Sequence, residues 1–141
     1  MVTEDYVSFE TAKLLKEKGF NEETEYVYSN DGELLRLCHF GINDLTNTDC
    51  NDYHTWQFPI EGVVSIISAP TLQMTMKWLR EREWFICVVP LAFYCGTKTW
   101  KFGYNIWAGD DLEVDELSTP EFSTYEEACE AAIKYCLEKL I

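Results

Sequence analysis

The chain has 141 residues, of which 47% are apolar and 15% aromatic, and its 25 acidic residues against 11 basic ones give a formal net charge of −14. This length favours one domain over residues 1–141 with a core of its own, and the apolar content excludes a disordered chain. The negative charge disfavours ordinary binding to nucleic acid or to an anionic membrane, because phosphate groups repel it, so neither is a predicted partner.

The chain is predicted to be cytoplasmic. Glu4, Asp5 and Glu10 interrupt its start, so no apolar run of signal-peptide length occurs there, and no stretch reaches the roughly 20 apolar residues of a membrane span. In that reducing compartment we expect all six cysteines to be free thiols, and none has the Cys-x-x-Cys spacing of zinc and redox motifs. The six are Cys38, Cys50, Cys87, Cys95, Cys129 and Cys136.

The first predicted elements are a helix over residues 8–18 and a β-hairpin. Ser8 can cap the first helical turn, apolar residues recur at helical spacing, and Gly19 suits the left-handed position that ends a helix. After it, Asn30, Asp31 and Gly32 supply the turn residues of a hairpin between two short extended runs.

The middle of the chain is predicted to be a long loop followed by a helix. Residues 41–62 mix Gly, Asn, Asp, Thr and Pro with no period, and loops of such length in compact domains are usually functional or mobile. Ser68 is the predicted cap of the next helix, with Pro70 in its first turn. The apolar stripe of that helix consists of Leu72, Met76 and Leu79.

Three strands are predicted next. Residues 84–95 are apolar at both odd and even positions, which predicts a strand buried on both faces, and Pro90 predicts an edge, a bulge or a break. After a turn, residues 100–107 alternate as in a half-buried antiparallel strand. The acidic run LEVDEL, over residues 112–117, is the third predicted strand.

The chain ends in a predicted amphipathic helix. Ser123 and Glu126 fit a capping box, in which each side chain bonds the backbone N–H of the other residue. Glutamates occupy one face of the helix, and small apolar residues occupy the other, so we expect it to dock on the protein's own core. The predicted apolar stripe is Tyr125, Ala128, Cys129, Ala132, Cys136 and Leu140.

Together these segments predict an α+β fold. The predicted order is α-β-β-α-β-β-β-α, with an antiparallel sheet of about five strands that carries three helices on one face.

Three segments resemble a known group of proteins. The sequences VSFETAKLLKEKGF, APTLQMTMKWLRE and FSTYEEACEAAIKYCLEKLI cover about a third of the chain. They are similar to a group of small uncharacterised proteins encoded by Bacteroides and its relatives, often in prophages or other mobile elements. The group has no assigned activity, so no catalytic residues transfer from it. The resemblance implies a bacterial or phage-derived cytoplasmic accessory protein.

Two sets of residues are candidates for chemistry. Cys50 and His54, four positions apart, could form a nucleophile–base pair, but a zinc site would need further ligands at suitable spacing, so no metal or other cofactor is predicted. A polar loop with a stray cysteine is the simpler interpretation. The aromatic residues Trp84, Trp100, Tyr104 and Trp107 could line a pocket for a small ligand, although core packing is their commoner role.

No sequence motif of a known catalytic class is present, which leans against an enzyme and leaves no predicted catalytic residue. The first hypothesis is a non-enzymatic acidic protein–protein interaction module that meets a basic protein partner. The alternative is a small-ligand-binding domain with an aromatic-lined pocket. A third hypothesis is an enzyme that uses Cys50 and His54.

Overall fold

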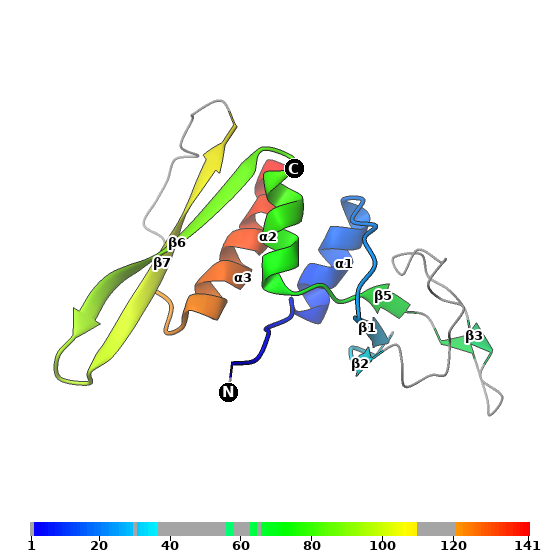
Figure 1. Cartoon of the computed structure of the whole chain (residues 1–141), viewed down its shortest axis with the longest axis horizontal. Coiled ribbons are helices and arrows are strands. Elements are labelled where there is room, and N and C mark those ends of the chain that lie inside the picture. The colour runs from blue at the N-terminus through cyan, green and yellow to red at the C-terminus, as the bar shows by residue number, and fades with distance from the viewer. Residues whose placement is uncertain (1, 30, 37–55, 58–62, 65, 110–120) are drawn as a thin grey trace. The chain divides into compact units, whose positions relative to one another are not determined.

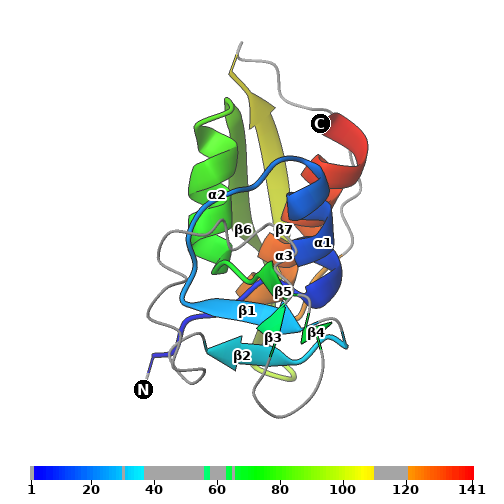
Figure 2. The same ribbon diagram turned by 90° about the vertical axis from the view of Figure 1, so that its right-hand side faces the viewer.

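The structure is a computed structural model that describes residues 2–29, 31–36, 56–57, 63–64, 66–109 and 121–141. Contacts between Cα atoms divide the chain into two compact units, one formed by Tyr6–Thr71 and the other by Met1–Asp5 with Leu72–Ile141. Figures 1 and 2 label the elements of both units. A single domain over residues 1–141 stays a prediction.

The unit Tyr6–Thr71 opens with helix α1 (Phe9–Glu17), which confirms the first predicted helix. The Ser8 side chain caps it by accepting a hydrogen bond of 3.2 Å from the backbone N–H of Thr11. At the other end, Gly19 has a φ of 92°, and the N–H groups of Gly19 and Phe20 donate back to carbonyls of the last turn. This Schellman motif satisfies carbonyls that a helix end leaves unpaired.

The predicted β-hairpin is also confirmed. Strands β1 (Tyr26–Ser29) and β2 (Leu34–Arg36) pair antiparallel, and Gly32 in the turn has a φ of 86°. Strand β5 (Ile66–Ser68) pairs antiparallel with the other edge of β1, so the sheet order is β2-β1-β5. Burial of Val27 and Ile67 makes this sheet part of the core.

A separate two-stranded antiparallel sheet joins β3 (Trp56–Gln57) to β4 (Val63–Val64). The expectation that residues 41–62 are wholly irregular is therefore wrong at β3. A strand of 2 residues is too short to produce any periodicity in the sequence. Residues 41–55 and 58–62 lie outside the described residues.

The second unit contains helix α2 (Leu72–Arg80). Ser68 does not cap this helix, contrary to the prediction, because it lies in β5 opposite Val27 and is buried there. Extended chain thus continues past Ser68, and Pro70 precedes the helix rather than lying in its first turn. The predicted apolar stripe is buried as expected: Leu72, Met76 and Leu79.

Strands β6 (Trp84–Tyr94) and β7 (Thr99–Ala108) form a long antiparallel ribbon, joined by a turn over residues 95–98. A register shift between Pro90 and Ala92 makes a β-bulge, which confirms the irregularity predicted at Pro90. In both Figures 1 and 2, helices α2 and α3 lie on the same face of this ribbon. The expectation that residues 84–95 are buried on both faces is wrong. Among the described strands β6 pairs with β7 alone, and helices cover only one face of this pair, so several side chains of β6 are exposed.

Helix α3 (Tyr125–Tyr135) continues into a π-helical turn, η3 (Cys136–Leu140). The predicted capping box is shifted by one residue. Thr124, not Ser123, accepts from the backbone N–H of Glu127 at 3.1 Å, and the Glu127 carboxylate accepts from the backbone N–H of Ser123 at 3.3 Å. The start moves because Phe122 is still paired with β7, so the chain becomes helical only after Thr124.

The apolar side of α3 and η3 is buried, but its membership differs from the prediction. Tyr125 is exposed and Leu140 is half-buried, whereas Ile133 and Leu137 are fully buried. Two neighbouring rows at i, i+4 spacing form the buried stripe, which is why it is wider than predicted. Its members are Ala128, Cys129, Ala132, Ile133, Cys136 and Leu137, all with no exposed surface.

Over the described residues the fold is α+β with three α-helices and antiparallel strand pairing, in an order that agrees with the prediction apart from the added strands β3, β4 and β5. One sheet of about five strands is not shown: the described strands form three separate sheets. Residues 112–117, the predicted acidic strand, lie outside the described residues. No helix of the described chain has the length and apolar character needed to cross a membrane.

Candidate functional site

The two faces of the β6–β7 ribbon differ in what covers them. Cross-strand partners share a face, and the faces alternate along each strand. One face contains Ile86 and its partner Ile106, and Ile106 is only 3% exposed. We call this the inner face, because helices α2 and α3 pack on the ribbon there. The opposite face, which contains Phe85 and its partner Trp107, is the outer face.

Aromatic contacts hold the inner face to the start of α3. Phe102 forms an isolated bridge with Phe122, with reciprocal backbone hydrogen bonds of 2.9 and 2.8 Å. The Phe102 ring packs edge-on against Tyr125, and the Tyr104 ring stacks on Phe122, with centroids 6.2 and 6.1 Å apart. Burial raises the pKa of the Tyr104 hydroxyl. These contacts fix the ribbon to the helices through its β7 side.

The outer face presents large apolar side chains to solvent. Phe85 is 42% exposed, Leu91 47%, Tyr94 44% and Trp107 39%. In the described chain, six of the eleven exposed large apolar side chains lie on the ribbon, so the exposure is concentrated there. A grouped apolar surface of this kind is typical of an interaction site, whereas single exposed apolar residues are ordinary.

The exposure continues at the turn end of the ribbon. Phe93 and Trp100 face each other across the strands with ring centroids 5.1 Å apart, yet they are 44% and 51% exposed. Their positions belong to the inner face, but Figure 1 shows the ribbon extending beyond the helices at this end. Here both faces of the ribbon are therefore uncovered.

A bulge shapes the middle of the outer face. Leu91 is the extra residue of β6, and it folds over Gly103 on β7. A Cβ atom added at Gly103 would lie 2.6 Å from Leu91 Cδ1, so the Leu91 side chain takes the space that a side chain on residue 103 would use. Leu91 thereby fills a gap between its neighbours on the outer face.

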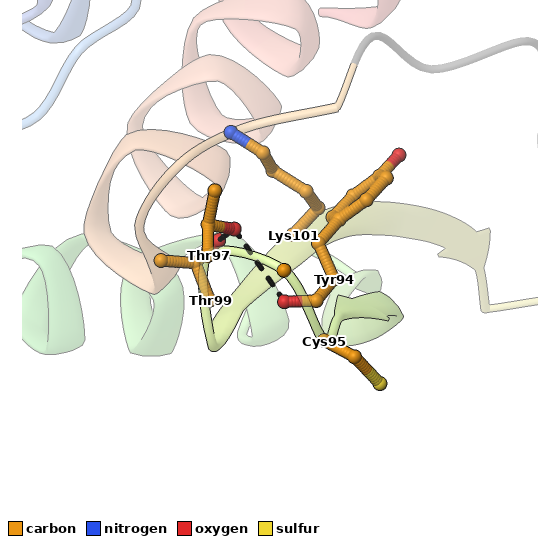
Figure 3. Close-up of a pocket in the computed structure, with 6 residues that line it drawn as sticks. Tyr94, Cys95, Thr97, Thr99 and Lys101 are labelled. Carbon is orange, nitrogen blue, oxygen red and sulfur yellow. Dashed lines mark hydrogen bonds between the residues drawn. The ribbon is translucent and has the colours of Figure 1, made fainter.

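A hollow of about 510 Å³ lies at the turn of the ribbon (Figure 3). In Figure 3 the side chains of Tyr94 and Lys101 point to one side of the turn, and the Cys95 thiol points to the other. The hydroxyl groups of Thr97 and Thr99 are hydrogen-bonded to each other at 2.6 Å. The lining residues are Tyr94, Cys95, Gly96, Thr97, Thr99 and Lys101.

Polar contacts anchor the rim of this hollow to the segment before α3. The Tyr94 hydroxyl donates to Glu121 Oε2 at 2.9 Å, and this hydrogen bond to a carboxylate raises the pKa of Tyr94. Lys101 Nζ donates to Ser123 Oγ at 3.3 Å. Both contacts are exposed, so they orient the two side chains and contribute little to stability.

The charge of the ribbon is unlike that of the chain. Residues 84–108 contain Lys98 and Lys101 and not one of the 25 acidic residues. The rest of the chain therefore carries all the negative charge. The ribbon is thus an apolar surface with two cations in a chain that is strongly acidic as a whole.

The four aromatic candidates from the sequence do not come together. Trp84, Trp100 and Tyr104 occupy inner-face positions, and Trp107 lies on the outer face beside Phe85. None of the four lines the hollow at the turn. Ligand binding by this set stays a prediction.

The second candidate pair, Cys50 and His54, lies outside the described residues, as does Cys38. The four described cysteines are free thiols, with Cys87 and Cys95 exposed. Cys129 and Cys136 face the core as predicted, and burial raises the pKa of each thiol to about 12. Within the described residues, no group of three or more His, Cys, Asp and Glu side chains could hold a metal ion.

The sequence pattern alone does not identify Phe85, Leu91 and Tyr94 as surface residues. The apolar run 84–95 predicts a strand buried on both faces, and this pattern does not reveal which of the two faces is exposed. One pattern could have indicated it. The run is followed by a short turn and by residues 100–107, in which apolar and polar side chains alternate, and a strand with this alternation belongs to a sheet with one solvated face.

No protein-family model, curated protein or solved structure matches this chain.

Proposed function

We propose that this protein is a non-enzymatic, cytoplasmic protein–protein interaction module, and that the outer face of the β6–β7 ribbon is its binding surface. One observation carries the proposal. Phe85, Leu91, Tyr94 and Trp107 share that face, and each is about 40% exposed or more. Aromatic side chains are enriched at the centres of protein interfaces, where they bury a large area at a small cost in conformational entropy.

The net charge of −14 suits a basic protein partner. Acidic surface outside the ribbon attracts such a partner from a distance and raises the rate of encounter. The apolar outer face then supplies the close contact, since residues 84–108 carry no carboxylate that would have to lose its hydration. Charge thus brings the partner near, and the aromatic side chains hold it.

Site-specific photocrosslinking in the native cell tests this proposal. A photoreactive amino acid at Tyr94, on the outer face, is expected to capture a specific protein. The matched control places the same amino acid at Glu126, which is exposed on α3. The captured protein should be lost when Phe85 and Trp107 are both replaced by Ser. Equal capture from Glu126, or capture that survives the double substitution, would contradict the proposal.

The hollow at the turn favours a second candidate function, which is small-ligand binding. Its volume of about 510 Å³ lies in the usual range for small-molecule sites, roughly 300–1,000 Å³. The Tyr94 ring, the threonine hydroxyls and the Lys101 ammonium group suit an aromatic carboxylate. Benzoate should then raise the melting temperature of the wild-type chain and leave that of a Lys101→Met variant unchanged. No shift in the wild-type chain would remove this candidate.

A further inference from the structure

The free edge of β6 carries an inference beyond the proposed function. Among the described strands, β6 pairs with β7 alone. The far edge of β7 is different, because Phe122 bonds to Phe102 there in both directions. An edge strand with unpaired N–H and C=O groups is a template for another strand.

The hydrogen-bond pattern identifies which backbone groups of β6 point to the free edge. Phe102 uses its N–H and C=O toward Phe122, so its pairing with Pro90 on the other side is of the kind without direct hydrogen bonds. Bonded and non-bonded pairs alternate along an antiparallel ladder. The backbone groups of Trp84, Ile86 and Val88 therefore point away from β7.

Pro90 limits this free edge. It has the same orientation as Val88 but no N–H group, and the bulge follows directly after it. The stretch that can accept a further strand is therefore 84–88. Natural edge strands use proline and bulges in this way to restrict pairing.

Charge indicates what can approach this edge. Two copies of a chain with a net charge of −14 repel each other over most of their surfaces. The ribbon, residues 84–108, is free of acidic residues, so two copies meet with least repulsion when ribbon faces ribbon. A second copy also brings an edge of the same length and the same apolar side chains.

We infer that β6 pairs antiparallel with β6 of a second copy, about a two-fold axis at Ile86. In this register Trp84 pairs with Val88 of the second copy, and every outward N–H and C=O of 84–88 finds a partner. A register centred one residue later would place Trp84 opposite Pro90, which has no N–H for the Trp84 carbonyl. The contact is isologous, so it closes as a dimer.

The pairing places the outer faces of the two copies side by side, on the same side of the joined sheet. Phe85 of each copy lies beside Cys87 of the other, and the two ribbons become one four-stranded sheet. The outer face itself is not consumed, because strands join edge to edge. A partner of the kind proposed above could therefore bind the dimer over a surface of doubled extent.

A pair of double variants tests the pairing and its register. Phe85 and Cys87 are both exposed on the outer face, so their replacement should leave the fold of each chain intact. Phe85→Lys with Cys87→Lys places like charges opposite each other across the two-fold axis. Phe85→Lys with Cys87→Glu changes the same positions and places opposite charges there.

Sedimentation equilibrium over a concentration series gives the dissociation constant of each protein, and melting curves check that each variant is folded. We expect the wild-type chain to dimerise, the Lys/Lys variant to dimerise roughly tenfold more weakly or worse, and the Lys/Glu variant to recover. A monomeric wild-type chain would overturn the inference, as would equal dimerisation of both variants or a Lys/Glu variant as weak as Lys/Lys. A monomeric wild-type chain that is still photocrosslinked through Tyr94 would overturn the dimer and leave the proposed function standing.

Discussion

Helix α3 and the β6–β7 ribbon pack against each other, yet their apolar side chains end in different environments. The stripe of α3, which includes Cys129 and Ala132, has no exposed surface, whereas Phe85 and Trp107 on the ribbon are 42% and 39% exposed. A helix concentrates its apolar residues on one side, so one neighbour suffices to bury them. A ribbon has two faces, and helices cover only one of them. The helix thus buries its apolar side chains in the core, and the ribbon keeps large apolar side chains exposed on its outer face.

The largest loss of stability is expected when a charge is inserted into the buried stripe of α3. Ala132→Glu buries a carboxylate in a packed interface, which costs at least several kcal/mol, comparable with the whole stability of a small domain. Glu138→Lys, on the exposed side of the same segment, should cost under about 1 kcal/mol. Urea denaturation of the two variants measures both values. A cooperative Ala132→Glu transition near that of the parent would mean that the stripe is not core.

A proline scan distinguishes the two edges of β6. Cys87→Pro removes an N–H that points to β7, opposite Asn105, and should cost roughly 2 kcal/mol or more. Val88→Pro removes an N–H that points away from β7, so it leaves the ladder of the ribbon intact and should cost much less. Denaturation at low protein concentration, where association does not contribute, compares them. Equal costs would mean that the alternation of hydrogen bonds assigned to β6 is wrong.

Alkaline pH should lower the stability of the protein through the two buried thiols of α3 and η3. Burial raises the pKa of Cys129 and Cys136 from 9.0 to about 12 in the folded chain. Between these values the unfolded chain loses thiol protons that the folded chain keeps, so stability is complete below pH 9 and falls as pH rises toward 12. The loss approaches about 1.4 kcal/mol per pH unit for each thiol.

Denaturation midpoints from about pH 8 to about pH 10.5 follow this loss. Cys136→Ala should flatten the pH dependence, because one of the two titrating thiols is absent. Cys87→Ala replaces an exposed cysteine in the same way and is the matched control for the substitution itself. If Cys136→Ala does not alter the slope, another group is responsible for the alkaline sensitivity.

The smallest predicted effect is a gain in stability at the base of the ribbon. Glu83 has a φ of 65°, a left-handed conformation that suits glycine. Its Cβ also lies against Gly109, where an added Cβ would be only 2.6 Å away. Glu83→Gly should raise stability by about 1 kcal/mol, whereas Glu83→Ala removes the same charge, keeps a Cβ and should not. Equal melting temperatures for the two variants would exclude backbone strain as the cause.

Helix ends were predictable only where local sequence decides them. Ser8 and Gly19 fix both ends of α1 through neighbours a few residues away. Ser68 and Ser123 look equally suited as caps, but strand β5 and the bridge of Phe122 hold the chain extended at these positions. Cap choice there depends on pairing with distant segments, which a local pattern does not contain.

The exposed outer face could not be predicted for a related reason. Apolar residues at odd and even positions of 84–95 indicate how apolar the two faces are, and not how many neighbours cover them. The packing of α2 and α3 decides that, and in the described part of the chain both helices lie on the same face of the ribbon. Pro90 predicted an edge, a bulge or a break, and a bulge directly follows it.

Because of the bulge at Leu91, β6 can lose one residue without any change in the face on which its other side chains lie. Pro90 lies on the inner face, Ala92 on the outer face and Phe93 again on the inner face, so Leu91 is the one residue that alternation does not need. Loss of the Leu91 codon from the gene would thus leave every remaining side chain on its present face. Loss of the Cys87 codon would instead turn one arm of the strand over. Related genes can therefore gain or lose a codon at this position while every other side chain of the ribbon stays on its present face.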